Sequence, residues 1–456
     1  LDRFQVDQGS VAIEGAGLNA NNVDRFEIIT RSAKINAEIQ AQNLTIVAGR
    51  NDVNAQTLNA TARADDGSAK PQLAIDSSAL GGMYAGAIKL VGTEAGVGVK
   101  LDGKLIASGG DIQLDANGQL SLVDTSATGA VNVKAASLDA RGPVYAGTAL
   151  NVQTQGNLTN RQTLAARDSI NLSAGGQLTN AGVIEAGVNA DGSRNANGDL
   201  SLSAQNLDNT GKSLVAGRNL TVSTAQTLSN QGGTLSGQTT AITAGTLDNR
   251  NSGRVLSGGT MNLNAAQVLN NKGVINSQTR LTGNIGQLIN RNGELSGQTD
   301  AVLTVTSLDN VAGVMTAGQL LDITALGAIN NSNGGRIGAR QALTLRAQQF
   351  DNSQQGQLTS EGTLTTRFSD RLDNQNKGLI QANAAMDVQA TRLDNRAGKI
   401  SSLNTLTVTS ANTDNRSGTI RADQAAKLLI SELDNGDKGR VESKTTLTFE
   451  GNTLDN

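Results

Sequence analysis

The stretch "SLDNVAGVMTAG", Ser307 to Gly318, contains an apolar residue, a polar pair, a small turn and then more apolar residues. The same arrangement returns as "RLDNRAGKISSL" at Arg392 to Leu403 and as "TLDNRNSGRVLSGG" at Thr246 to Gly259. A phrase that recurs at a regular interval is typical of a repeat protein, in which each copy builds one structural unit. The interval between copies therefore decides the fold.

From Asn151 onward, an apolar residue, any residue and then Asn recur. The apolar member stands at Leu158, Leu178, Leu207, Leu228, Leu247, Val268, Leu288, Leu308, Ile329, Phe350, Leu372, Leu393, Leu433 and Leu454, with Thr413 as its one polar replacement. The steps are 20, 29, 21, 19, 21, 20, 20, 21, 21, 22, 21, 20, 20 and 21 residues. The long step contains the polar stretch "VNADGSRNANGD", Val188 to Asp199. A period near 20 predicts a solenoid.

Apolar residues two apart, such as Met315 and Ala317 or Leu321 and Ile323, indicate strands rather than helices. Each period is expected to hold two short strands and a third, shorter strand that ends at LDN. Strands of this length can wind as coils of a parallel β-helix, in which each strand pairs with its equivalent about 4.8 Å away. We therefore predict an all-β fold, a parallel β-helix of about 20-residue coils and roughly 22 coils in total.

The phrase LDN has a physical reason in such a coil. Leucine is expected to face the core, aspartate to face water, and asparagine to occupy a corner where left-handed backbone is tolerated. The glycines three or four residues later, including Gly211, Gly313, Gly398 and Gly418, are expected to supply the next bend. Stacked asparagine amides can hydrogen-bond up the coils as a ladder. The predicted ladder comprises Asn209, Asn230, Asn249, Asn290, Asn310, Asn331, Asn352, Asn374, Asn395, Asn415 and Asn435. The alternative is that these asparagines bind a ligand.

Composition limits the chemistry. The 456 residues include no Cys, His or Trp, only 2% aromatics, and 37 basic against 40 acidic residues. Catalysis by Ser-His-Asp or Cys-His and the common zinc sites are therefore excluded, and no cofactor or metal is expected. No basic block suggests nucleic acid, and no apolar run approaches the ~18 residues of a membrane helix.

Two acidic features leave alternatives open. Paired carboxylates at Asp65 and Asp66 or at Asp111 and Asp115 could serve a β-helix polysaccharide-degrading enzyme, although solvated surface acids are the simpler interpretation. The oxygen-bearing stretch from Asn189 to Asp199 could wrap calcium, but it lacks the glycine and glutamate of an EF-hand loop. We interpret it as a mobile loop that bulges from one coil.

Two further stretches carry a family resemblance. They are "VAIEGAGLNANNVDRFEIITRSAKINAEIQAQNLTIVAGRNDV", Val11 to Val53, and "LGGMYAGAIKLVGTEAGVGV", Leu80 to Val99. With the later repeats, they resemble the two-partner secretion exoproteins, which include filamentous haemagglutinins, large haemolysins and effectors of contact-dependent growth inhibition. The resemblance spans essentially the full chain. It implies a right-handed parallel β-helix at the outer-membrane surface of a Gram-negative bacterium, exported through an Omp85-type outer-membrane transporter.

The resemblance also divides the chain. Residues 1–60 are expected to end an amino-terminal secretion-domain-like β-helix, 61–150 to form an irregular junction, and 151–456 to form regular haemagglutinin repeats with a loop insertion at 188–199. The Asn-Pro-rich motif of the secretion domain is missing, because the two prolines are Pro71 and Pro143. We therefore expect that domain to start upstream of Leu1.

The expected function is a rigid shaft that projects an adhesive or toxin-delivering tip toward other cells. The shaft is expected to be a monomeric, non-enzymatic filament, and the target-cell receptor to be contacted by other parts of the protein. The alternative is that the β-helix itself binds a surface glycan or receptor. In that case residues 60–150 or the loop at Val188 to Asp199 are the places to look, since no break in the repeat is expected from Gly211 to Asn456.

Overall fold

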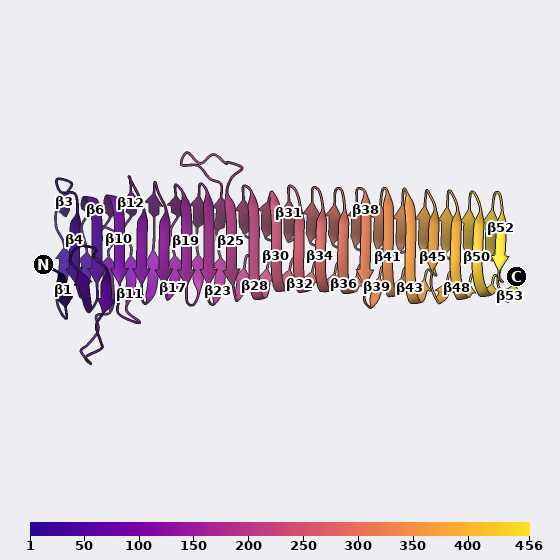
Figure 1. The fold of residues 1–456 in the computed structure, drawn as a ribbon, viewed down its shortest axis with the longest axis horizontal. Helices are drawn as coiled ribbons and strands as arrows, with labels where there is room; N and C mark the ends of the chain where they lie inside the picture. The colour runs from indigo at the N-terminus through magenta and orange to yellow at the C-terminus, as the bar shows by residue number, and fades with distance from the viewer. The chain divides into compact units, whose positions relative to one another are not determined.

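A computed structural model describes all residues, 1–456, as 53 strands with no helix. The predicted parallel β-solenoid is confirmed: equivalent strands pair in parallel, with Leu288 opposite Leu308, one period apart. Figure 1 shows successive coils with their equivalent strands side by side. The chain divides into two compact units, Leu1–Gln226 and Thr227–Asn456, which are described separately. No helix in the structure is long and apolar enough to cross a membrane.

A coil of the second unit consists of β35 (Glu294–Gly297) and β36 (Ala301–Asp309). The predicted third strand is not separate here. It is the second half of β36, which pairs with both β38 (Leu320–Ala325) and β39 (Ala328–Asn330). Those two strands are separate because Leu326 and Gly327 intervene between them. In most coils of this unit no such pair intervenes, so the second and third strands form one bent strand. The prediction of three separate strands in each coil is therefore wrong for these coils.

The alternating apolar residues all face the core. Around β37 (Val314–Ala317), none of these side chains is more than 4% exposed: Leu308, Met315, Ala317, Leu321, Ile323 and Ile329. Each coil therefore adds one thin apolar layer. The polar replacement Thr413 is also buried, and its hydroxyl lies 2.6 Å from that of Ser410, so the two satisfy each other.

One coil of the second unit breaks the pattern, contrary to the expectation of an unbroken repeat from Gly211 to Asn456. The register between β41 (Ala342–Asp351) and β43 (Thr363–Asp373) shifts after Ala347, which places one extra residue in β43. A bulge of this kind restores the alternation, so that Leu364 and Leu372 both face the core. The extra residue accounts for part of the 22-residue step. The same coils contain the stacked pair Phe350 and Phe368, with ring centroids 5.2 Å apart.

The first unit combines parallel coils with a small antiparallel sheet. In the coils, β6 (Ile39–Ala48) pairs in parallel with β10 (Met83–Gly92). Beside them, β1 (Arg3–Val6) and β8 (Ala60–Ala62) flank β7 (Asn51–Asn54), both antiparallel to it. Val47, Val53 and Leu58 form the core beneath this sheet, with Phe4 and two other partly buried residues packed against them.

Ion pairs link the strands of the antiparallel sheet and, separately, two segments of the neighbouring coils. Arg63 contacts Asp7 at 3.0 Å and Asp52 at 3.1 Å. Nearby, Arg31 pairs with Glu94 at 3.0 Å, and both side chains are only 9% exposed. The buried charges of Arg31 and Glu94 therefore satisfy each other.

Candidate functional site

The LDN asparagines of the second unit make a continuous column of hydrogen bonds. Asn310 accepts a hydrogen bond at Oδ1 from Asn290 Nδ2 at 2.7 Å and donates from Nδ2 to Asn331 Oδ1 at 2.7 Å. Every internal amide in the column is buried in the same way. The column runs through Asn230, Asn249, Asn270, Asn290, Asn310, Asn331, Asn352, Asn374, Asn395, Asn415, Asn435 and Asn456.

The amide of Asn310 also holds two pieces of backbone. The Nδ2 group of Asn310 donates to the carbonyl of Gly313 in its own turn and to the carbonyl of Arg336 in the next coil, both at 3.1 Å. One side chain therefore closes its own corner and fixes the first strand of the following coil. Because all the amides have the same orientation, their hydrogen bonds polarise one another along the column.

The predicted left-handed backbone at these asparagines is wrong. None has a positive φ, because the backbone remains extended: the N–H of Asn310 donates to the carbonyl of Asn330 at 2.7 Å. The left-handed residue lies two positions later, with φ between 51° and 57°. It is Asn251, Lys272, Asn292, Ala312, Asn333, Gln354, Asn376, Ala397, Ser417 and Asp437 in successive coils.

The glycine after this turn also has a different role from the predicted one. Gly313 has no positive φ, yet a Cβ on it would lie 2.1 Å from the carbonyl oxygen of Asn290. A Cβ at Gly398 or Gly418 would similarly approach the preceding ladder carbonyl to 2.0 or 2.2 Å. Close approach between coils, rather than an unusual φ, therefore requires glycine at these places. Gly211, with φ of 66° and open space around it, is the left-handed type.

The length of this turn explains most of the variation in the period. After Asn290 the glycine follows three residues later and the step to the next coil is 20 residues. After Asn374 it follows four residues later, a second residue, Lys377, is left-handed, and the step is 21 residues. The extra residue is absorbed in the turn, so the column and the strands keep their register.

The first unit contains the beginning of a similar column. Asn160 Nδ2 donates to Asn180 Oδ1 at 2.9 Å, and Asn180 Nδ2 donates to Asn209 Oδ1 at 2.8 Å. In the preceding coil the residue that pairs with Asn160 is Ala140, which has no side-chain amide, so the column does not continue there. The sequence prediction included Asn209 but missed Asn160, Asn180, Asn270 and Asn456. Their signal was present, since all four stand two residues after an apolar residue.

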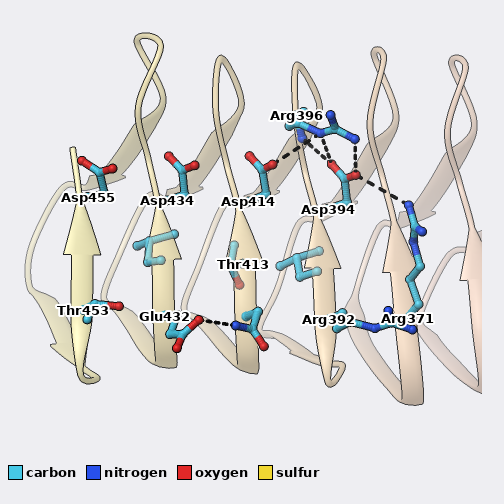
Figure 2. Close-up of a pocket in the computed structure, with 13 residues that line it drawn as sticks. Arg371, Arg392, Asp394, Arg396, Thr413, Asp414, Glu432, Asp434, Thr453 and Asp455 are labelled. Carbon is cyan, nitrogen blue, oxygen red and sulfur yellow. Dashed lines mark hydrogen bonds and ion pairs between the residues drawn. The ribbon is translucent and has the colours of Figure 1, made fainter.

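The aspartates of LDN do more than face water, as Figure 2 shows for the last coils. Arg396 lies 2.7 Å from Asp394 and 3.5 Å from Asp414 of the next coil. Arg416 repeats the arrangement one coil later, at 2.6 Å from Asp414 and 3.3 Å from Asp434. Burial opposes the charge of Asp414, but hydrogen bonds from Arg416 hold the pKa of that carboxyl below its ordinary value.

This row of charges borders a groove of about 570 Å³ that crosses β46 (Arg392–Asp394), β48 (Leu406–Asp414), β50 (Ala426–Asp434) and β53 (Thr453–Asp455). On its other side, Asn412 donates to Glu432 at 2.5 Å. The arginines of the groove already pair with aspartates of the same or adjacent coils. The groove therefore presents paired charges rather than a converging set of free groups.

The other acids considered from the sequence accept hydrogen bonds from neighbouring groups. Asp111 accepts a hydrogen bond from the Ala130 N–H at 2.7 Å, and Asp115 accepts one from the Gln113 side chain at 2.8 Å. Asp65 and Asp66 accept hydrogen bonds from the backbone of their own loop. The structure brings together no group of three or more acidic residues that could hold a metal ion.

The insertion at 188–199 bulges from the coils and forms a hairpin that contacts them. It leaves β24 (Val183–Ala186), forms an antiparallel bridge between Val188 and Arg194, and enters β25 (Asp199–Ala204). Arg194 binds Glu185 through two hydrogen bonds of 2.8 and 3.0 Å. Tyr145 donates to the carbonyl of Val188 at 3.1 Å. In Figure 1 the hairpin leans back over earlier coils of its unit.

Parallel coils of about 20 residues, stacked through a buried amide column, define a haemagglutinin-repeat β-solenoid. Comparison of the sequence with family models agrees. The haemagglutinin repeat matches residues 126–182, 185–250, 233–285, 280–333, 316–376, 367–413 and 378–456, and the TPS secretion domain matches residues 1–122. The chain belongs to the family of haemagglutinin-repeat exoproteins with a TPS secretion domain, as predicted.

The relatives are CdiA proteins. The chain is 32% identical over 458 residues to the 16S rRNA endonuclease CdiA of Enterobacter cloacae, a match that covers 100% of the chain and 12% of that relative. It is 39% identical over 210 residues to the tRNA nuclease CdiA of Yersinia mollaretii, covering 45% of the chain and 7% of that protein. It is 48% identical over 122 residues to the tRNA nuclease CdiA-2 of Burkholderia pseudomallei, covering 27% and 4%. No solved structure matches the chain.

The chain is thus homologous to the CdiA proteins of contact-dependent growth inhibition, but spans only 12% of the relative that matches it throughout. The secretion domain implies export through a partner transporter in the outer membrane of a Gram-negative bacterium. The repeats that match are the structural coils described above.

Proposed function

We propose that these coils form a rigid β-helical shaft of a large exoprotein displayed on the outer-membrane surface. The shaft carries an adhesive or toxin-delivering tip toward other cells. The observation that supports this proposal most strongly is the asparagine column, because a buried amide such as that of Asn310 bonds to two neighbouring coils and to the turn of its own coil. A chain stacked in this way resists bending between coils, which is what a spacer requires.

The surface chemistry supports the same proposal. Many of the carboxylates and arginines that project from the regular coils are paired with each other, as Arg396 and Asp394 are. They offer no converging set of groups for catalysis. We therefore assign no enzymatic activity to these coils and place the adhesive or toxic activity in other parts of the exoprotein.

The proposed organisation has three parts: a secretion-domain end at residues 1–60, a junction at 61–150, and the regular shaft at 151–456. An Omp85-type transporter would recognise the secretion domain during export. The mature filament is proposed to be monomeric, and its target-cell receptor to be contacted by segments other than the regular coils.

A second candidate function is recognition of a surface glycan or receptor by the β-helix itself. The hairpin at 188–199 favours it, because this hairpin interrupts the regular spacing of the repeat and projects above Tyr145. A binding surface needs side chains that differ from coil to coil, and the hairpin is the longest such departure.

Deleting one whole coil tests the shaft proposal. Removal of residues 290–309 from the full-length exoprotein joins Ile289 to Asn310, so the column and the register remain continuous. The shaft proposal predicts normal surface display and unchanged contact-dependent activity or adhesion. A protein that is displayed normally but no longer contacts its target would show that the coils recognise the target.

A half-coil deletion is the matched control. Removal of residues 290–299 takes out one asparagine of the column and the strand Glu294–Gly297, so the flanking strands lose their register. We expect this protein to be degraded or poorly displayed. Normal display after both deletions would contradict the importance of the coil register.

A further inference from the structure

Five asparagines in the chain stand directly before glycine: Asn117, Asn197, Asn292, Asn333 and Asn435. Such a pair is chemically labile, because the glycine nitrogen can attack the asparagine side-chain carbonyl and no Cβ hinders it. The reaction requires a side chain that is free to rotate and a peptide nitrogen that is free to leave its hydrogen bond. The structure distinguishes the five pairs on these two requirements.

Three pairs have an engaged glycine nitrogen. Gly293 donates to the carbonyl of Asn290 at 3.1 Å, and Gly334 donates to that of Gln354 at 3.0 Å. Gly436 donates to the carboxylate of Asp434 at 3.0 Å. In each case the attack must first break a hydrogen bond of the stacked corner.

A fourth pair is restrained at the side chain. Asn117 Nδ2 donates to the carbonyl of Thr93 in the preceding coil at 3.0 Å. Its rotation toward Gly118 therefore costs a hydrogen bond between coils.

The fifth pair, Asn197 and Gly198, has neither restraint. Asn197 is exposed, its side chain makes no hydrogen bond, and only its backbone N–H is held, by Asn195 Oδ1 at 2.9 Å. The N–H of Gly198 donates no hydrogen bond. Both residues precede β25, and the buried Gly198 accepts a hydrogen bond at its carbonyl from the Arg218 N–H at 2.8 Å, which leaves its own N–H unengaged.

We propose that Asn197 is a site of spontaneous deamidation in the folded protein. The Gly198 nitrogen forms a bond to Asn197 Cγ, the bond from Cγ to Nδ2 breaks, and the peptide proton leaves with the amide as ammonia. Water then opens the cyclic imide at either carbonyl, which yields aspartate or isoaspartate. The main-chain atom that isoaspartate inserts lies between Asn197 and Gly198, before Asp199, the first paired residue of β25.

The product changes the charge of the hairpin. A new carboxylate appears two residues from Asp199, which binds Arg218 of the next coil at 2.6 Å. The segment of the first unit that departs most from the repeat thereby becomes more acidic with time after export. The site is independent of the shaft proposal, since it depends only on the local hairpin.

Peptide mapping by mass spectrometry tests the site. The folded chain and the same chain in denaturant are incubated in mildly alkaline buffer, and conversion is followed at all five pairs. We expect similar rates at the five pairs in denaturant. In the folded chain, Asn197 keeps most of its rate while Asn292 slows several-fold. Equal slowing of Asn197 and Asn292 on folding would overturn the proposal.

A pair of matched variants gives a second readout by isoelectric focusing. We expect Asn197→Ser to remove the slowly appearing acidic species. Asn292→Ser should leave them in place, and serine already occupies the equivalent left-handed position at Ser417. Persistence of the acidic species in Asn197→Ser would also overturn the proposal.

Discussion

Replacing Asn310 by leucine removes one rung of the buried column while keeping a side chain of similar length. The amide oxygen of Asn331 then loses its donor, and Asn290 loses its shortest acceptor contact, at 2.7 Å. The bonds to the carbonyls of Gly313 and Arg336, both 3.1 Å, are lost as well. The site is fully buried, so water cannot replace these partners.

The magnitude follows from these contacts. An orphaned buried polar group costs roughly 1–3 kcal/mol, and each further net hydrogen bond lost costs about 1 kcal/mol. The Asn331 oxygen is the orphaned group, and the two carbonyl contacts are the further losses. We therefore expect Asn310→Leu to lower the local free energy of unfolding by roughly 3–5 kcal/mol.

Asp309→Ser is the matched control one residue away. Asp309 pairs with Arg291, whose side chain is 53% exposed, and accepts a hydrogen bond from the Val311 N–H. An exposed ion pair contributes little, and serine can still accept the backbone bond. We expect Asp309→Ser to lower the free energy of unfolding by less than about 1 kcal/mol.

Hydrogen exchange resolved along the chain measures both variants, because a long solenoid need not unfold as one unit. Asn310→Leu should accelerate exchange in its own coil and in the two adjacent coils, with smaller effects beyond them. Equal protection in the two variants would refute the reasoning, since the buried amide would then contribute no more than an exposed carboxylate.

Gly313→Ala should destabilise the corner by about 1–3 kcal/mol through overpacking, whereas Gly211→Ala should cost less, and thermal unfolding of the two variants compares them. Thr413→Val should cost roughly 1–3 kcal/mol by orphaning the Ser410 hydroxyl, and a second change, Ser410→Ala, should recover most of it. Asp414 has a depressed pKa, so its contribution to stability is complete above the unfolded pKa of about 3.9 and is lost as pH falls through the folded value. Denaturation midpoints measured from neutral to acid pH should therefore fall only in the acid range, and less steeply for Asp414→Asn.

Much of the fold was predictable because the same pattern of apolar residues and asparagines recurs along the sequence. A period near 20 with alternating apolar residues specifies stacked coils, and Leu308 and Ile329 are buried in the predicted way. The asparagine column was also indicated by spacing. Asn270 was missed although it stands two residues after Val268, the same spacing that identified Asn290, which also follows an apolar residue, Ile289.

Other features had no local signal. The left-handed position is occupied by Lys272, Ala312 and Ser417 in different coils, so its backbone comes from the stacked turn rather than from residue preference. The antiparallel pairing of Arg3–Val6 with Asn51–Asn54 joins segments that are far apart in the sequence. Neither segment carries a turn signature that would reveal such a pairing.

The contacts of the hairpin with the coils had no local signal either. A polar, glycine-containing stretch such as Val188 to Asp199 is usually mobile. Its attachment depends on Glu185 and on Tyr145, which lies 43 residues before its partner Val188. Only the stacking of coils brings these residues together.

The central claim is that parallel coils stack in register with a period of about 20 residues. Disulfide trapping tests this claim most directly. Thr304 and Thr324 are paired on the outer face, so their Cα atoms should lie about 4.8 Å apart, within the ~4.4–6.8 Å that a disulfide spans. The chain has no cysteine of its own, so each double variant reports one distance. Oxidation should join Thr304→Cys to Thr324→Cys, but not Thr304→Cys to Arg346→Cys, two coils away. Absence of the first disulfide, or formation of the second with equal efficiency, would contradict the stacked coils.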